Sequence, residues 1–350
     1  MSPTARAAKR IPYAALAPVA AVLLALVAGG GLIATLGQSP LEVYGLLLSQ
    51  ALGTGYGFGQ TLFKATPLVF AGLSVALAFR AGLFNVGVEG QMYLGGFAAG
   101  LVGAYVPLPA PLLLPVALLA AALAGAVWGA IPGVLKARFG AHEVINTIML
   151  NFIAFALVAW WGHALFVPAT VRTREIAPAA VIPRLDLVLP WLKNSPVNFA
   201  LPLGVLLALA LGVYLFRTRR GYELRVLGLS PGAAEYAGVR TGAAQVQAFA
   251  LAGALAGLGG VSYVLGYKHF FEQDFTAGAG FMGIAVALIG RSQPLGVLVS
   301  ALFFGALAYG GLVVNQRVPS DLVNVLRALV ILFAISSHAL FSRWARRAGA

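Results

Sequence analysis

The chain has 350 residues, of which 60% are hydrophobic and only 9% are charged, whereas soluble domains carry about 25% charged residues. Its net charge of +13 would suit a nucleic-acid partner in a soluble protein. In a chain this apolar, the basic residues instead indicate short cytoplasmic loops between membrane spans, and nucleic acid is not an expected partner. The absence of cysteine excludes disulfides, thiolate metal sites and cysteine nucleophiles.

The apolar runs predict an all-α polytopic membrane protein with about ten spans, within a range of roughly 8 to 11. The first run is longer than a signal-peptide core, so it is interpreted as an uncleaved span, with a cleaved signal as the alternative. The run at 280–290 is too short for an ordinary crossing, and we expect a tilted helix, a helix extended into its Gly-rich flank, or half of a broken element that lines a cavity. The expected spans are 13–36, 62–79, two crossings within 81–135, and then 143–166, 198–216, 243–266, 280–290, 294–314 and 321–341.

The distribution of basic residues predicts the orientation of these spans. With this count, roughly twice as many Lys and Arg residues fall on the side of Arg6, Lys9 and Arg10 as on the other side, which predicts that both termini are cytoplasmic. Residues 1–350 then form a single transmembrane domain. Its largest external segment is 167–197, where we expect a short helix or lid, and the Gly-rich stretch 53–60 is also expected to be an external loop.

Three polar residues interrupt the apolar run that follows residue 81. Asn85, Glu89 and Gln91 lie in GLFNVGVEGQMYLGG, which also holds several glycines. A carboxylate at the centre of a membrane costs roughly 2.5 to 3.5 kcal/mol, so Glu89 is expected to face protein or water and to have a partner. The stretch is interpreted either as a broken element that lines a translocation path or as a helix-packing network.

A second polar cluster lies in HEVINTIMLN, at 142–151. Glu143 falls near the expected cytoplasmic edge, where an interfacial ion pair is the simpler interpretation. Asn146, Thr147 and Asn151 fall deeper, and their amides and hydroxyl are candidate contacts for a neutral polar solute.

Glycines recur at spacings that allow helices to approach each other closely. Gly125, Gly129 and Gly133 are four residues apart, as are Gly253 and Gly257, which favours helix packing. GAGFMG at 278–283 fits the dinucleotide-binding pattern in its letters, but no preceding strand or downstream acid accompanies it. A weak similarity between the Gly-rich elements at 82–96 and 278–296 suggests an inverted-repeat core with discontinuous helices.

The basic segment 217–242 separates two apolar runs and is expected to be a cytoplasmic coupling loop. Ser230 followed by Pro231 is typical of an N-cap and a first helical residue, and Gly238 is typical of the residue just after a helix end. The signals predict a helix of about seven residues, which is marginal alone in water. A partner surface is therefore expected to order it.

Several segments together resemble the membrane permease subunits of ABC importers in the branched-chain amino acid, ribose and nucleoside permease group, with the nucleoside or simple-sugar type most similar. The segments that carry the resemblance are FNVGVEGQM, EVINTIMLNFIA, GYELRVLGLSPGAAEYAG and GIAVALIGRSQPLG. The resemblance implies a prokaryotic cytoplasmic membrane, alternating access, and no catalytic or metal-binding residue in this chain. It also implies three partners besides membrane lipid: a second permease, an ATPase that binds ATP and Mg, and an external substrate-binding lipoprotein.

Two groups of candidate residues follow, the first from the polar residues themselves and the second from the basic segment together with the resemblance, which implies that 230–238 is a coupling helix. The expected substrate pathway contains Asn85, Glu89, Gln91, Asn146, Thr147 and Asn151. The expected coupling residues toward the ATPase are Arg225, Ser230, Pro231, Ala234, Glu235, Tyr236 and Gly238.

The substrate and the energy source leave alternatives open. A nucleoside is the first expectation, followed by sugars, riboflavin or branched-chain amino acids. An ion-coupled secondary transporter is the alternative from another class, although Glu89 is almost alone as an intramembrane carboxylate. The chain has no Walker A sequence, so ATP hydrolysis would belong to another chain.

Overall fold

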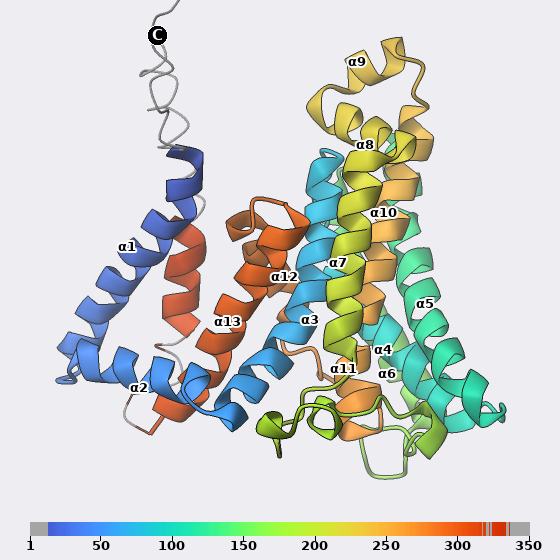
Figure 1. The fold of residues 1–350 in the computed structure, drawn as a ribbon. Helices are drawn as coiled ribbons and strands as arrows, with labels where there is room; N and C mark the ends of the chain where they lie inside the picture. The colour runs from blue at the N-terminus through green and yellow to red at the C-terminus, as the bar shows by residue number, and fades with distance from the viewer. Residues whose placement is uncertain (1–12, 317, 320–321, 323, 334–335, 337–350) are drawn as a thin grey trace, which may run out of the picture. The chain divides into compact units, whose positions relative to one another are not determined.

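The computed structural model describes residues 13–316, 318–319, 322, 324–333 and 336. Within these residues the chain folds into helices joined by turns, and strand pairing is limited to isolated bridges (Figure 1). The expected all-α class is confirmed. Arg6, Lys9 and Arg10, and parts of the expected span 321–341, lie outside the described residues.

The chain divides into two compact units, one formed by residues 1–46 and 311–350 and the other by residues 47–310. The first unit contains α1 (Tyr13–Thr35) and the beginning of α2 (Pro40–Leu52). The Tyr44 hydroxyl donates a hydrogen bond of 2.8 Å to the carbonyl oxygen of Leu26, which fastens α2 to α1. The second unit holds every candidate site residue named above.

Six helices in the described residues are long and apolar enough to cross a membrane, or seven spans if the bent pair α1 and α2 forms one. Two other expected spans correspond to helices that are more polar or shorter, α4 (Val88–Tyr105) and α12 (Ala279–Ile289). α12 has 11 residues, which confirms the short element expected at 280–290. The six helices that are long and apolar enough to cross a membrane are α3 (Gly55–Arg80), α5 (Ala110–Phe139), α6 (Glu143–Leu165), α7 (Ala200–Arg217), the run Thr241–Lys268 that begins with α10 (Thr241–Leu258), and α13 (Pro294–Val314).

The expectation of a loop at 53–60 is wrong, because α3 begins at Gly55. Thr54 caps this helix by accepting a hydrogen bond of 2.9 Å from the Gly57 amide. The glycines also permit close packing, since a Cβ at Gly59 would collide with Ser195. Packing against the rest of the unit therefore overrides the low helix propensity of glycine.

The glycines spaced by four residues lie where α5 and α10 cross. A side chain at Gly125 would strike the carbonyl oxygen of Gly253, and one at Gly257 would strike the carbonyl oxygen of Ala121. The absence of side chains lets the two backbones touch, which gains dispersion energy along the contact. The predicted role of these glycines in helix packing is confirmed.

The two ends of the second unit carry different structures. At one end, the connection between α6 and α7 contains three short 3-10 helices, η1 (Pro178–Ala180), η2 (Leu185–Leu187) and η3 (Pro190–Leu192). At the opposite end, α8 (Arg219–Leu229) and α9 (Pro231–Tyr236) project beyond the long helices (Figure 1). The expected coupling loop and the expected external segment therefore lie at opposite ends of the bundle.

Candidate functional site

The carboxylate of Glu89 joins the beginnings of two helices. Glu89 lies in the first turn of α4 and is 3% exposed. One of its oxygens accepts a hydrogen bond of 3.0 Å from the Gly278 amide, and the other accepts from the amides of Gly280 at 2.6 Å and Phe281 at 3.3 Å. These amides belong to the N-terminus of α12, where unpaired N–H groups and the helix dipole favour a negative charge. Glu89 therefore has the partner that its burial requires.

Glycine allows this contact to form. A Cβ at Gly280 would lie 2.5 Å from both the Cα and the backbone nitrogen of Glu89. Gly278 has a φ of +80°, which directs the chain into α12 and is accessible to glycine without strain. The GAGFMG motif thus forms the turn and first residues of a helix that receives a carboxylate.

Asn85 and Gln91 form a second part of the cluster, beside Glu89. Both side chains are buried. The Asn85 amide donates to Gln91 Oε1 at 3.0 Å and accepts from Gln91 Nε2 at 3.2 Å. Asn85 Oδ1 also accepts from the Gly87 amide at 3.1 Å. These bonds hold the non-helical segment 83–87 against the start of α4.

α6 supplies the third part of the cluster through Thr147 and Asn151. Asn151 Oδ1 accepts from the Gly90 amide at 2.8 Å, and its Nδ2 donates to the Val86 carbonyl oxygen at 3.0 Å. Thr147 Oγ1 accepts from the Val86 amide at 3.3 Å. Both residues are buried, and they satisfy backbone groups that the irregular segment leaves free. These hydrogen bonds join α6 to the segment before α4 and to the first turn of α4.

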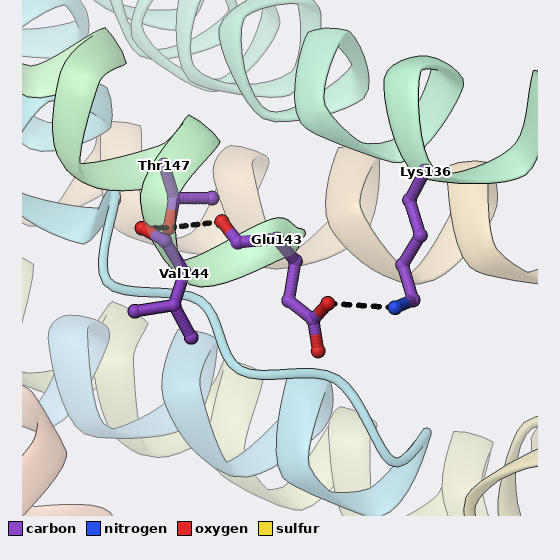
Figure 2. Close-up of polar contacts among 4 residues, drawn as sticks. All are labelled: Lys136, Glu143, Val144 and Thr147. Atoms are coloured by element: carbon purple, nitrogen blue, oxygen red, sulfur yellow. Dashed lines mark hydrogen bonds and ion pairs between the residues drawn. The ribbon is translucent and has the colours of Figure 1, made fainter. Parts of the chain in front are cut away.

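Glu143 and Asn146 lie at the edge of this cluster. Figure 2 shows Glu143 Oε2 paired with Lys136 Nζ at 2.6 Å, an ion pair that joins the end of α5 to the start of α6. Thr147 in the same view donates to the Glu143 carbonyl oxygen at 2.8 Å. Asn146 differs from its neighbours, because its Nδ2 atom is buried without a hydrogen-bond partner. It is the amide in the expected pathway whose donor is unused.

The short helix expected after Ser230 is confirmed as α9, with six residues. Ser230 Oγ accepts a hydrogen bond of 3.3 Å from the Ala233 amide at its start. At its end the Val239 amide donates to Ala234 O and the Gly238 amide donates to Glu235 O, with Gly238 at a φ of +77°. This is a Schellman motif. Both ends of α9 are therefore closed by local hydrogen bonds.

The faces of α9 differ in exposure. Tyr236 is 98% exposed and Leu229, just before the helix, is 87% exposed, whereas Ala234 is fully buried. Large exposed side chains such as these are typical of a surface that contacts another protein. Ala234 thus faces the protein's own interior, while Tyr236 is available to a partner.

Sequence reasoning missed α8, which connects α9 to the bundle. Thr218 caps it by accepting a hydrogen bond of 3.1 Å from the Gly221 amide. Near its other end, Gly228 packs against the end of α3, where a Cβ would collide with the Arg80 carbonyl oxygen and would lie 2.8 Å from the Gly82 nitrogen. Thr218, three residues before Gly221, was a local signal for the start of this helix. No local pattern indicated that Gly228 would contact Gly82.

Arg80 extends this contact to the segment after α12. Its Nε donates a hydrogen bond of 2.9 Å to the Ser292 carbonyl oxygen. Arg291 and Ser292 both have positive φ, at 54° and 49°. The end of α3 therefore contacts α8 on one side and the turn between α12 and α13 on another. No group of His, Asp and Glu in the described part of the chain is arranged to hold a metal ion.

Several known proteins are similar in sequence to this chain over most of its length. The guanosine ABC transporter permease protein of Bacillus subtilis is 38% identical over 93% of this chain and 94% of its own length. A glucose ABC transporter permease protein of Haloferax volcanii is 36% identical over 93% of this chain and 88% of its own length. A nucleoside ABC transporter permease protein of Lactococcus lactis is 33% identical over 91% of this chain and 90% of its own length.

The family described as the permease component of the branched-chain amino acid transport system matches residues 57–335. This range contains the Glu89 cluster and both projecting helices, α8 and α9. The chain belongs to this family of membrane permease components.

Proposed function

We propose that the chain is the permease subunit of an ATP-driven importer that carries a nucleoside, or a similar small polar solute, across the cytoplasmic membrane. The guanosine and nucleoside permeases among its relatives support this substrate class. The glucose permease supports a sugar as the second candidate. The observation that carries the proposal is α9, a capped and exposed helix at one end of an apolar bundle.

The proposed mechanism couples a separate ATPase to the bundle through α9. The partner would contact the exposed face around Tyr236, with Glu235 beside it, while Ser230, Pro231 and Gly238 shape the helix. Ala234 would fix α9 against α8 from its buried side. Because α9 is held by its own caps, a push on it is transmitted to α8 rather than absorbed by unwinding.

A continuous set of contacts leads from α8 to the intramembrane cluster. Gly228 of α8 touches Gly82 at the end of α3. The chain after Gly82 runs through Asn85 to Glu89, whose carboxylate holds the N-terminus of α12. Arg80 reaches the other end of α12 through Ser292. A displacement of α8 would therefore bias the positions of α4 and α12 together, which is a physical route for alternating access.

Within this mechanism, the buried members of the cluster are proposed to position helices. Asn85, Glu89, Gln91, Thr147 and Asn151 direct their polar atoms to protein groups. Asn146 is the proposed solute contact, because its unused donor would become available when the helices rearrange. The remaining proposed partners are a second permease, an external substrate-binding lipoprotein and membrane lipid, and both termini are proposed to be cytoplasmic.

Uptake into vesicles tests the proposed energy source. Vesicles that carry the complex in their membrane, with ATP inside and radiolabelled guanosine outside, should accumulate the guanosine. Accumulation should stop with vanadate and survive an uncoupler. The reverse pattern would support the ion-coupled alternative and contradict the importer. Competition by unlabelled glucose in the same vesicles would separate the two substrate classes.

A further inference from the structure

Three arginines lie near one another: Arg80 at the end of α3, Arg225 in α8 and Arg291 just after α12. The guanidinium carbon of Arg80 lies 5.6 Å from the centre of the Phe216 ring, and that of Arg225 lies 5.2 Å from the same ring. Arg80 also donates to the carbonyl oxygens of Ser292 and Arg291, at 2.9 and 3.4 Å. The charges of Arg225 and Arg291 repel that of Arg80. These three residues are called the arginine cluster below.

No carboxylate in the described part of the chain forms an ion pair with the arginine cluster. The four ion pairs found there use other cations, including Lys136 and Arg219. The Nε atom of Arg225 is moreover buried without a hydrogen-bond partner. The carbonyl oxygens that Arg80 contacts, and the C-terminal dipole of α3, offset only part of the charge. The cluster thus has guanidinium donors left for an anion.

The position of the cluster identifies the kind of anion. Arg80 is the last residue of α3, and Phe216 is the penultimate residue of α7, both of which are long enough to span a membrane. Their ends therefore lie at the level of lipid headgroups. Phe216 and Tyr222 are 40% and 56% exposed, as is usual for aromatic residues at a membrane interface. α9, by contrast, projects farther out (Figure 1).

We propose that Arg80, Arg225 and Arg291 bind the phosphate headgroup of an anionic phospholipid. Guanidinium groups offer planar paired donors that match phosphate oxygens. Bound there, the lipid would neutralise the cluster and hold α8 against the end of α3. It would thereby stabilise the contact between Gly228 and Gly82 from the membrane side.

The test compares lipids retained by the purified full-length chain. The protein is delipidated in detergent and offered equal amounts of phosphatidylglycerol and phosphatidylcholine, and the bound lipid is counted by native mass spectrometry. The wild type should retain phosphatidylglycerol preferentially. Arg225→Gln should lower that retention about five-fold, the effect of one basic residue at a membrane surface, and Arg225→Lys should recover most of it.

Arg219→Gln is the matched control, since Arg219 lies on the same helix with a side chain that is 92% exposed. It should leave retention unchanged. Should Arg225→Gln fail to fold, Arg291→Gln replaces an exposed member of the cluster and should give the same loss. Equal retention by the wild type and the folded cluster variants would overturn the proposal.

Two further arms separate other sources of an anion. If inorganic phosphate alone raises the unfolding temperature of the wild type but not of Arg225→Gln, and phosphatidylglycerol has no such effect, the ligand is a soluble anion and the lipid is excluded. If Arg225→Gln loses the copurifying ATPase while its lipid retention is unchanged, the cluster is a protein contact. Either result overturns the lipid site.

Discussion

The amide of Gly280 donates a hydrogen bond of 2.6 Å to the Glu89 carboxylate across 191 residues of sequence. This bond joins the two similar Gly-rich elements, 82–96 and 278–296. It also places the one deeply buried carboxylate of the cluster at the N-terminus of a short helix, where its charge is stabilised. In the proposed mechanism, this bond couples the movements of α4 and α12.

Replacement of Glu89 by glutamine should destabilise the protein. Glutamine keeps the shape but loses the charge, and its amide group would face N–H donors that need an acceptor. We expect a loss of about 1 to 3 kcal/mol, as for buried donors left unpaired. Thermal unfolding in detergent measures it, with Glu223→Gln, which affects only a partly exposed ion pair, as the control. If Glu89→Gln retains full stability but transports nothing, the carboxylate acts on the solute instead.

Gly228→Val should uncouple ATP hydrolysis from uptake. A side chain at this position meets the backbone of Arg80 and Gly82, and no rotamer avoids such a collision. α8 should shift away from α3. ATP hydrolysis should then continue while uptake falls roughly ten-fold, which is within the range of factors that correspond to typical coupling free energies. The control is Gly212→Ala, where a Cβ would have only an ordinary contact at 4.0 Å. Normal uptake by Gly228→Val would show that this contact transmits nothing.

The end of α9 can be tested by a pair of substitutions at Gly238. Its φ of +77° suits asparagine far better than a β-branched residue. Gly238→Val should therefore disrupt the cap and reduce uptake while leaving the spans folded, whereas Gly238→Asn should retain most uptake. Transport assays and thermal unfolding on both variants decide the matter. Equal uptake by the two would mean that the cap has no part in coupling.

Asn146 and Asn151 should respond differently to alanine. Asn151→Ala leaves the Gly90 amide and the Val86 carbonyl without partners, so folding and expression should fall in proportion to uptake. Asn146→Ala removes an unused donor, so expression should persist while guanosine transport weakens. Expression levels and uptake per folded molecule provide the comparison. Unchanged transport by Asn146→Ala would remove Asn146 from the solute path.

Local signals predicted some of this structure well. Ser230, Pro231 and Gly238 predicted α9 because helix caps depend on neighbouring residues only. The four-residue spacing of Gly125 and Gly129 predicted a close helix contact, because small residues on one face of a helix let a second helix backbone approach. The short run at 280–290 likewise indicated a helix too short to cross unaided.

Other features could not be derived from the sequence because they depend on contacts distant in the chain. The burial of Glu89 required a partner, but no pattern indicated that Gly280 would supply it. The glycines of 53–60 suggested a loop because glycine disfavours helices. Their role in packing depends on Ser195, which is distant in the sequence. The pairing of Gly228 with Gly82 has the same origin. These distant contacts are the ones on which the proposed mechanism depends.

Site-specific crosslinking tests the central claim, that α9 is the surface that binds the ATPase. The chain has no cysteine, so a single introduced one carries a unique crosslinker. In the purified complex, Tyr236→Cys at the tip of α9 should crosslink to the ATPase, whereas Trp191→Cys, an exposed position at the opposite end of the bundle, should not. Crosslinking of the ATPase from Trp191→Cys but not from Tyr236→Cys would contradict the account.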